Sequence, residues 1–191
     1  MDNKLKILNY LGKNIGKSFT MHELSKKTNV PYATFYRTIL KMNDLVKIQK
    51  VGRANTIALN ANNAAIKSYL VISSEEEKKD FLKKQPMIKK IVSELNTKDA
   101  ILLFGSYAKR SERKISDIDL MIINQSGGKS LSFSKYELLF KKKINAIFFT
   151  KTEFIKMLNE TDENVGKQAL KWHVVLNNAE SFWGCVLHGQ L

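Results

Sequence analysis

The chain has 191 residues, is 43% hydrophobic and carries a formal net charge of +14, from 32 Lys and Arg against 18 Asp and Glu. This length suits one medium domain or two small ones. The single cysteine, Cys185, excludes an intramolecular disulfide and argues against a cysteine-based metal site. No apolar run approaches the roughly 20 residues that a membrane span needs, and the charged N-terminus is unlike a signal peptide. We therefore expect a soluble, cytoplasmic protein without a membrane partner.

The positive charge is concentrated at the N-terminus. Residues 1–60 carry 11 basic and 3 acidic groups, a net of +8, whereas residues 61–99 have a net of +2 and residues 100–191 a net of +4. This asymmetry favours an N-terminal part that faces nucleic acid. Charge alone leaves open the alternative of a lysine-rich surface that only confers solubility.

The N-terminal segment predicts three helices and a hairpin. Residues 4–11 place leucines at helical spacing, and Thr20 with Glu23 forms the capping-box pattern of a second helix. A third helix is expected from Pro31, because proline suits a first helical turn. Two short alternating runs around the sequence GRAN then predict the hairpin.

This order of elements resembles the winged helix-turn-helix fold, over a domain that we expect to span residues 1–60. By that resemblance the helix from Pro31 would enter the major groove of double-stranded DNA, and the hairpin would be a wing that contacts phosphate or the minor groove. The alternative is a basic module used only for protein contact or dimerisation, so a homodimer is a further expectation. The candidate DNA-binding residues are Tyr32, Thr34, Tyr36, Arg37 and Lys41 on the helix and Lys50 and Arg53 near the hairpin tip.

The middle of the chain has helical and no strand periodicity. Residues 61–85 are expected to be a helical connector, and Pro86 should begin a fresh helix and the second domain, residues 86–191. Near the C-terminus, Trp172 and Trp183 fall in amphipathic helical segments and are expected in the core.

A strand, a tight turn and a helix start are predicted around Gly105 and Ser106. The apolar run of residues 100–104 has strand length, and the Gly-Ser pair follows it directly. Glycine allows the backbone to approach a ligand closely. The unpaired N–H groups of a helix start favour phosphate, and the Ser106 hydroxyl adds a donor.

Two aspartates lie two residues apart in the next apolar run, ISDIDLMII. In a strand, Asp117 and Asp119 share one face and advance roughly 6.5–7 Å. Two carboxylates on one face repel each other, so a hard cation such as Mg²⁺ is their natural complement. Together with the upstream Gly-Ser turn, the pattern indicates a metal and a nucleotide phosphate at one site.

The Gly-Ser pair, ten intervening residues and then Asp-Ile-Asp resemble the minimal nucleotidyltransferase motif of the DNA polymerase beta superfamily, in particular its small prokaryotic, antitoxin-like members. Ser116 before the first aspartate also matches. The resemblance implies that Asp117 and Asp119 are catalytic and hold Mg²⁺, and that Gly105, Ser106 and Ser116 bind the nucleotide. The expected fold class is α+β, with a winged helix-turn-helix followed by a nucleotidyltransferase-like mixed sheet and flanking helices.

One departure from the family concerns its third carboxylate, which lies on a neighbouring strand. The matching run is KKKINAIFFT, and the expected position holds Asn145. An amide carries no negative charge and is a poor general base. Either catalysis uses two carboxylates, or the domain binds nucleotide without efficient transfer, or the third position lies elsewhere. The lysines 141–143 before it are either a strand-entry cluster or an acceptor surface.

The resemblance implies transfer of a nucleoside monophosphate, most often AMP from ATP, to an acceptor hydroxyl with Mg²⁺ as cofactor. The first alternative is a DNA-binding transcriptional regulator whose nucleotidyltransferase domain is degenerate and senses nucleotide. The second is an antitoxin that pairs with a HEPN-type toxin and adenylylates it.

Overall fold

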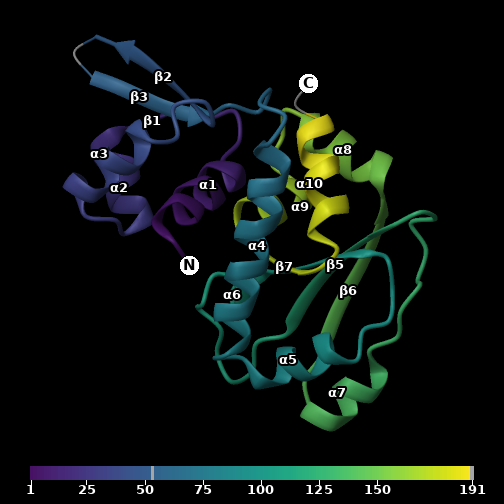
Figure 1. The fold of residues 1–191 in the computed structure, drawn as a ribbon. Coiled ribbons are helices and arrows are strands. Elements are labelled where there is room, and N and C mark those ends of the chain that lie inside the picture. The colour runs from purple at the N-terminus through teal and green to yellow at the C-terminus, as the bar shows by residue number, and fades with distance from the viewer. Residues whose placement is uncertain (53, 190–191) are drawn as a thin grey trace. The chain divides into compact units, whose positions relative to one another are not determined.

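The computed structural model describes residues 1–52 and 54–189 (Figure 1). Arg53, a predicted DNA contact, lies outside the described residues. The chain divides into two compact units, residues 1–73 and 74–189. The division falls within one long helix, α4 (Ile66–Leu82).

The N-terminal unit combines three helices with a small antiparallel sheet in which β1 and β2 both pair with β3. The helices and the hairpin lie where the sequence predicts them. Their bounds are α1 (Asn3–Lys13), β1 (Phe19–Thr20), α2 (Met21–Thr28), α3 (Tyr32–Leu40), β2 (Val46–Val51) and β3 (Ala54–Leu59).

Local signals explain where these helices begin and end. The Thr20 hydroxyl accepts a hydrogen bond from the Glu23 backbone N–H at 3.2 Å, which caps α2, and Asn29 ends α2 in the left-handed conformation. Pro31 precedes α3 as its cap residue instead of forming its first turn. Helix α3 ends sooner than its apolar pattern suggests, because tight turns follow it, yet Met42 is still fully buried.

The C-terminal unit is built on a mixed four-stranded sheet of order β6-β5-β4-β7. Strands β5 and β6 are parallel, whereas β4 is antiparallel to both β5 and β7. This arrangement confirms the predicted α+β class. The bounds are α5 (Pro86–Ser93), β4 (Ala100–Phe104), α6 (Gly105–Ala108), β5 (Ile118–Asn124), α7 (Ser134–Phe140), β6 (Ile144–Thr150), α8 (Lys151–Asn159), α9 (Val165–Lys171), β7 (Val174–Asn177) and α10 (Ala179–His188).

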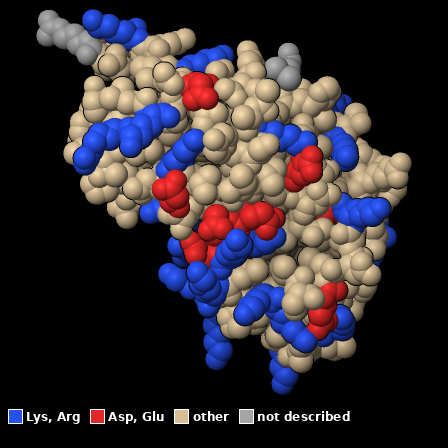
Figure 2. Space-filling model, viewed as in Figure 1, with Lys and Arg blue, Asp and Glu red and all other residues tan. Residues whose placement is uncertain are grey.

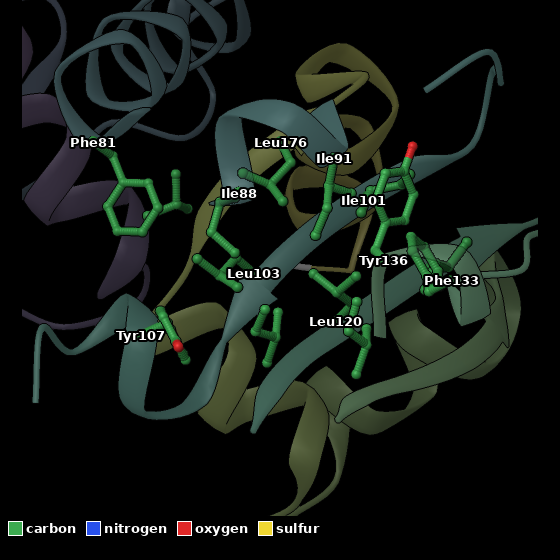
Figure 3. Close-up of a cluster of buried hydrophobic side chains, with 14 residues drawn as sticks. Phe81, Ile88, Ile91, Ile101, Leu103, Tyr107, Leu120, Phe133, Tyr136 and Leu176 are labelled. Atoms are coloured by element: carbon green, nitrogen blue, oxygen red, sulfur yellow. The ribbon is translucent and has the colours of Figure 1, made fainter. Parts of the chain in front are cut away.

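A hydrophobic cluster covers one face of this sheet. Figure 3 shows Ile88 and Ile91 of α5 facing the sheet residues Leu103 and Leu120. Phe81, at the end of α4, and side chains of α7 belong to the same cluster. Because side chains alternate along a strand, the neighbours of Leu120 in β5 point to the opposite face of the sheet. Helices α8, α9 and α10 contact the strands as well.

The two tryptophans differ from each other. Trp183 is fully buried in α10, and its indole N–H donates to the Ser74 hydroxyl at 2.8 Å. Trp172 is 47% exposed, so its predicted place in the core is wrong. The reason is that α9 ends at Lys171, which leaves Trp172 in the junction before β7 and not on the inward side of a helix.

Glu94 ties the end of α5 to α7. Its carboxylate accepts from Lys135 and Lys90, each at 2.6 Å, and from the Tyr136 hydroxyl at 2.8 Å. These hydrogen bonds, that of Lys135 foremost, lower the pKa of Glu94 to about 2. The carboxylate therefore stays ionised well into the acid range. Such exposed ion pairs stabilise a fold only modestly.

Charged side chains cover much of the surface. Figure 2 shows Lys and Arg spread over one face of the molecule, with Asp and Glu in smaller groups among them. Within the described part of the chain, no helix is both long and apolar enough to cross a membrane.

Candidate functional site

The end of β4 and the starts of β5 and β6 lie side by side at one end of the sheet of the C-terminal unit. Phe104, the last residue of β4, pairs with Asp119, and Asp119 pairs with Asn145 in the parallel strand β6. Gly105 follows Phe104 directly. The Gly-Ser turn, the two aspartates and Asn145 are therefore neighbours, although as many as 40 residues (105 to 145) separate them along the chain.

The side chain of Asn145 lies between the two carboxylates. Its nitrogen Nδ2 donates to Asp117 Oδ2 and to Asp119 Oδ1, each at 3.2 Å. Both aspartates reach the same nitrogen, so they share one side of the sheet, opposite to Leu120 and the hydrophobic cluster. A neutral amide with two N–H groups can satisfy one oxygen of each carboxylate. This contact offsets part of the repulsion between the two negative charges.

Gly105 makes room for Asp119. The backbone of Gly105 has φ +69°, and a Cβ added to it would lie 2.1 Å from Asp119 Oδ2. The carboxylate is thus packed directly against the glycine backbone. The sequence suggested that a ligand would approach this glycine, but the structure adds a nearer reason: only glycine allows both this φ and this close contact.

The two serines of the motif have different surroundings. Ser106 lies in the short helix α6, half-buried, and its carbonyl accepts from the Ser111 N–H at 3.0 Å. The Ser116 hydroxyl oxygen accepts from the Arg113 N–H at 2.8 Å. Ser116 therefore closes a turn in the loop before Asp117. Both serines lie within a few residues of the glycine or the aspartates.

The carboxylates fit a cation that arrives with phosphate oxygens. Mg²⁺ prefers oxygen ligands and is commonly held by one or two carboxylates together with the phosphates of a substrate. Among the described side chains, no group of three or more His, Cys, Asp or Glu forms a metal cluster. Asp117 and Asp119 are the residues that could hold such a cation together with the phosphate oxygens of a nucleotide.

The acids that flank β6 in the sequence, Glu137 in α7 and Glu153 in α8, do not supply a third carboxylate. Glu137 Oε1 accepts from the Ile144 N–H at 2.8 Å, at the start of the strand. Glu153 caps α8 by accepting from the Thr150 N–H at 2.7 Å, and this backbone hydrogen bond lowers the pKa of Glu153. The register of β5 and β6 places Asn145, and neither glutamate, opposite Asp119.

The predicted DNA contacts lie in the N-terminal unit. Tyr32 is 49% exposed and Tyr36 44%, whereas Thr34 is half-buried. Arg37 is exposed, and its Nε donates to the Ala33 carbonyl one turn earlier at 3.2 Å. Two lysines are exposed as well, Lys41 directly after α3 and Lys50 near the end of β2.

Comparison with known proteins identifies the class of the C-terminal unit. The family model described as "Polymerase beta, Nucleotidyltransferase" matches residues 86–181, just over half of the chain. The chain belongs to this nucleotidyltransferase family. No curated protein and no solved structure matches the chain.

Lys142 lies near the site, and the sequence did not distinguish it from its neighbours in the run of lysines 141–143. Its ammonium donates to the carbonyl oxygens of Lys114 and Ser116 in the loop that leads to Asp117. No spacing along the chain indicates this contact, because it depends on how β6 meets the loop.

We predict that Gly105→Ala destabilises the protein and displaces the Asp119 carboxylate. The added methyl group overlaps Asp119 Oδ2, and alanine is strained at this φ. The expected loss is roughly 1–3 kcal/mol in the free energy of unfolding, measured by urea denaturation. Gly128→Ala is the matched control, since the nearest atom to its added Cβ is 3.5 Å away. Equal stability of the two variants would contradict the packing of Asp119 on Gly105.

Proposed function

We propose that the C-terminal unit transfers a nucleoside monophosphate, AMP from ATP, to an acceptor hydroxyl and releases pyrophosphate, with Mg²⁺ as cofactor. One observation supports this most directly: Asp117, Asp119 and Asn145 lie together at one end of the sheet, beside Gly105. The family match supports nucleotidyl transfer in general. The donor, the metal and the acceptor are our proposal.

Asp117 and Asp119 would hold the cation, and the backbone around Gly105 and Ser106 would hold the outer phosphates. When bound, Mg²⁺ neutralises charge on the phosphate oxygens, which is a main source of rate in phosphoryl and nucleotidyl transfer. Asp119 lies in β5, Asp117 directly precedes it, and Asn145 of β6 hydrogen-bonds to both carboxylates, so little reorganisation is needed when the nucleotide binds.

The acceptor hydroxyl must lose a proton as its oxygen attacks the α-phosphorus. The Asn145 amide cannot take that proton. Among the side chains of the site, the carboxylate oxygens of Asp117 and Asp119 are the available bases, and both would also be metal ligands. A carboxylate that is also a metal ligand is a weaker base, so we expect transfer by this site to be slow. The same observation favours a second function, in which the domain binds nucleotide as a sensor and regulates DNA binding.

We predict that Asn145→Asp increases nucleotidyl transfer. The change is nearly isosteric and adds a third carboxylate opposite Asp119. A positioned general base typically contributes about 10²–10⁴-fold to a rate. The measurement is transfer of labelled AMP to the protein, to cell extract and to a HEPN-type toxin if the neighbouring gene encodes one.

Asp119→Asn is the control for this assay and should abolish transfer. A wild type that turns over briskly, with Asn145→Asp no faster, would show that Asn145 does not limit the reaction. A variant that binds Mg·ATP normally but stays inert would favour the sensor function.

We also propose that residues 1–60 bind double-stranded DNA as a winged helix, with α3 in the major groove and the β2–β3 hairpin as the wing. The net charge of +8 in these residues and the exposed face of α3, with Tyr32, Tyr36 and Arg37, support this. Arg37, Lys41, Lys50 and Arg53 would contact phosphates.

We predict that DNA affinity of the full chain falls steeply with salt, and that Arg37→Ala combined with Lys41→Ala weakens binding and flattens the salt dependence. Each lost phosphate contact should reduce the slope of log K against log[salt] by about 0.9. The measurement is fluorescence anisotropy with duplex DNA over a salt series. Lys84→Ala, an exposed lysine of the other unit, is the matched control and should change little. Affinity that does not depend on salt would instead favour a protein-contact module.

A further inference from the structure

The loop of residues 109–117 connects the two halves of the candidate site. It begins after α6, which carries the Gly-Ser turn, and it ends at Asp117. Most of its hydrogen bonds are local: the Ser111 N–H donates to the Ser106 carbonyl and the Ser116 N–H donates to the Arg113 carbonyl, each at 3.0 Å, and the Ser116 hydroxyl accepts from the Arg113 N–H at 2.8 Å. Glu112, in the middle of the loop, accepts from the Gln85 side chain at 2.6 Å. The residues that follow Glu112 need a further contact if Asp117 is to be held in place.

Lys142 supplies such a contact. Its ammonium Nζ donates to the Lys114 carbonyl at 2.6 Å and to the Ser116 carbonyl at 3.1 Å. It also lies 5.7 Å from the centre of the Tyr107 ring, within the range of a cation–π contact. Hydrogen bonds from a charged donor are stronger than those between neutral groups. Lys142 is half-buried, whereas its neighbours Lys141 and Lys143 are exposed.

The backbone is hydrogen-bonded on both sides of Asp117. The carbonyl before it, that of Ser116, accepts from the Lys142 side chain, and the N–H after it, that of Ile118, donates to the Lys143 carbonyl at 3.0 Å. Asp117 itself precedes β5, which begins at Ile118. The Lys142 ammonium therefore holds the backbone at Ser116, and the hydrogen bonds between β5 and β6 hold it from Ile118 onward.

We infer that Lys142 is a positioning residue, which holds the backbone of Asp117 so that both carboxylates can take the cation of an Mg·nucleotide. This inference rests on the proposed nucleotide site. On this inference Lys142 acts through Asp117 and not on the phosphates, because two of the three N–H donors of its ammonium are engaged by the backbone before Asp117. The loss of Lys142 should consequently affect nucleotide binding only when the metal is present.

The test is calorimetric titration of the full chain with ATP, in Mg²⁺ and separately in EDTA. Lys142→Met keeps most of the apolar stem and removes the charge. We expect it to weaken Mg·ATP binding by roughly 10–100-fold, the range seen when the residues that orient metal ligands are changed, and to leave metal-free ATP binding unchanged. Lys142→Arg keeps the charge and the donors and should restore most of the affinity. Lys141→Met and Lys143→Met remove the same charge from exposed positions and should have little effect.

A double-mutant cycle with Asp117→Asn separates positioning from general stabilisation. If Lys142 acts through Asp117, Lys142→Met has no further effect on Mg·ATP affinity in the Asp117→Asn background. An equal loss in both backgrounds overturns the inference and shows that Lys142 acts independently of Asp117. An equal loss in EDTA overturns it as well, because the effect then does not depend on the metal. Lys142→Met that binds Mg·ATP like the wild type also overturns it, while the proposed function stands. A wild type that binds no Mg·ATP overturns both.

Discussion

The hydrogen bonds from the Asn145 amide to two carboxylates are the interaction on which the site depends. Asp119 lies in β5 and Asp117 directly precedes that strand, and an amide nitrogen 3.2 Å from each carboxylate joins them. The rest of the site follows from the place of these carboxylates. Position 105 must be glycine because Asp119 is packed on its backbone, and the last residues of the loop before Asp117 accept hydrogen bonds from Lys142.

An amide in place of a third carboxylate changes the balance of charge at the site. Three clustered carboxylates repel each other strongly without metal, whereas an amide donor between two carboxylates offsets part of their repulsion. The same substitution removes an anionic ligand, so a free cation gains less on entering. In our proposal, the phosphates of a nucleotide therefore become necessary partners in binding the metal. We expect such a site to respond to the metal–nucleotide complex more than to the metal alone.

Much of this could be predicted from the sequence where the signal is local. The apolar runs before Gly105 and around Asp119 have strand length, and the Gly-Ser and Asp-Ile-Asp motif predicted that the turn and the aspartates belong to one site. The register of Asn145 opposite Asp119 agrees with the position inferred for it. The contact of Asp119 with Gly105 and that of Lys142 with the loop could not be predicted, because they depend on how separate strands pair. The prediction that Trp172 is buried was wrong for a local reason, because α9 ends at the preceding residue, Lys171. The winged helix and its DNA contacts remain a proposal.

Binding of Mn²⁺, a spin-active substitute for Mg²⁺, tests the central claim most directly. Electron paramagnetic resonance would measure free Mn²⁺ in titrations of the wild type and of Asn145→Asp, with and without ATP. Our account predicts that the wild type binds Mn²⁺ alone only weakly. With ATP present, the wild type should bind more Mn²⁺ than ATP binds in the absence of protein. Asn145→Asp should bind Mn²⁺ clearly without ATP. Tight binding of Mn²⁺ to the wild type without nucleotide, unchanged in Asn145→Asp, would contradict it.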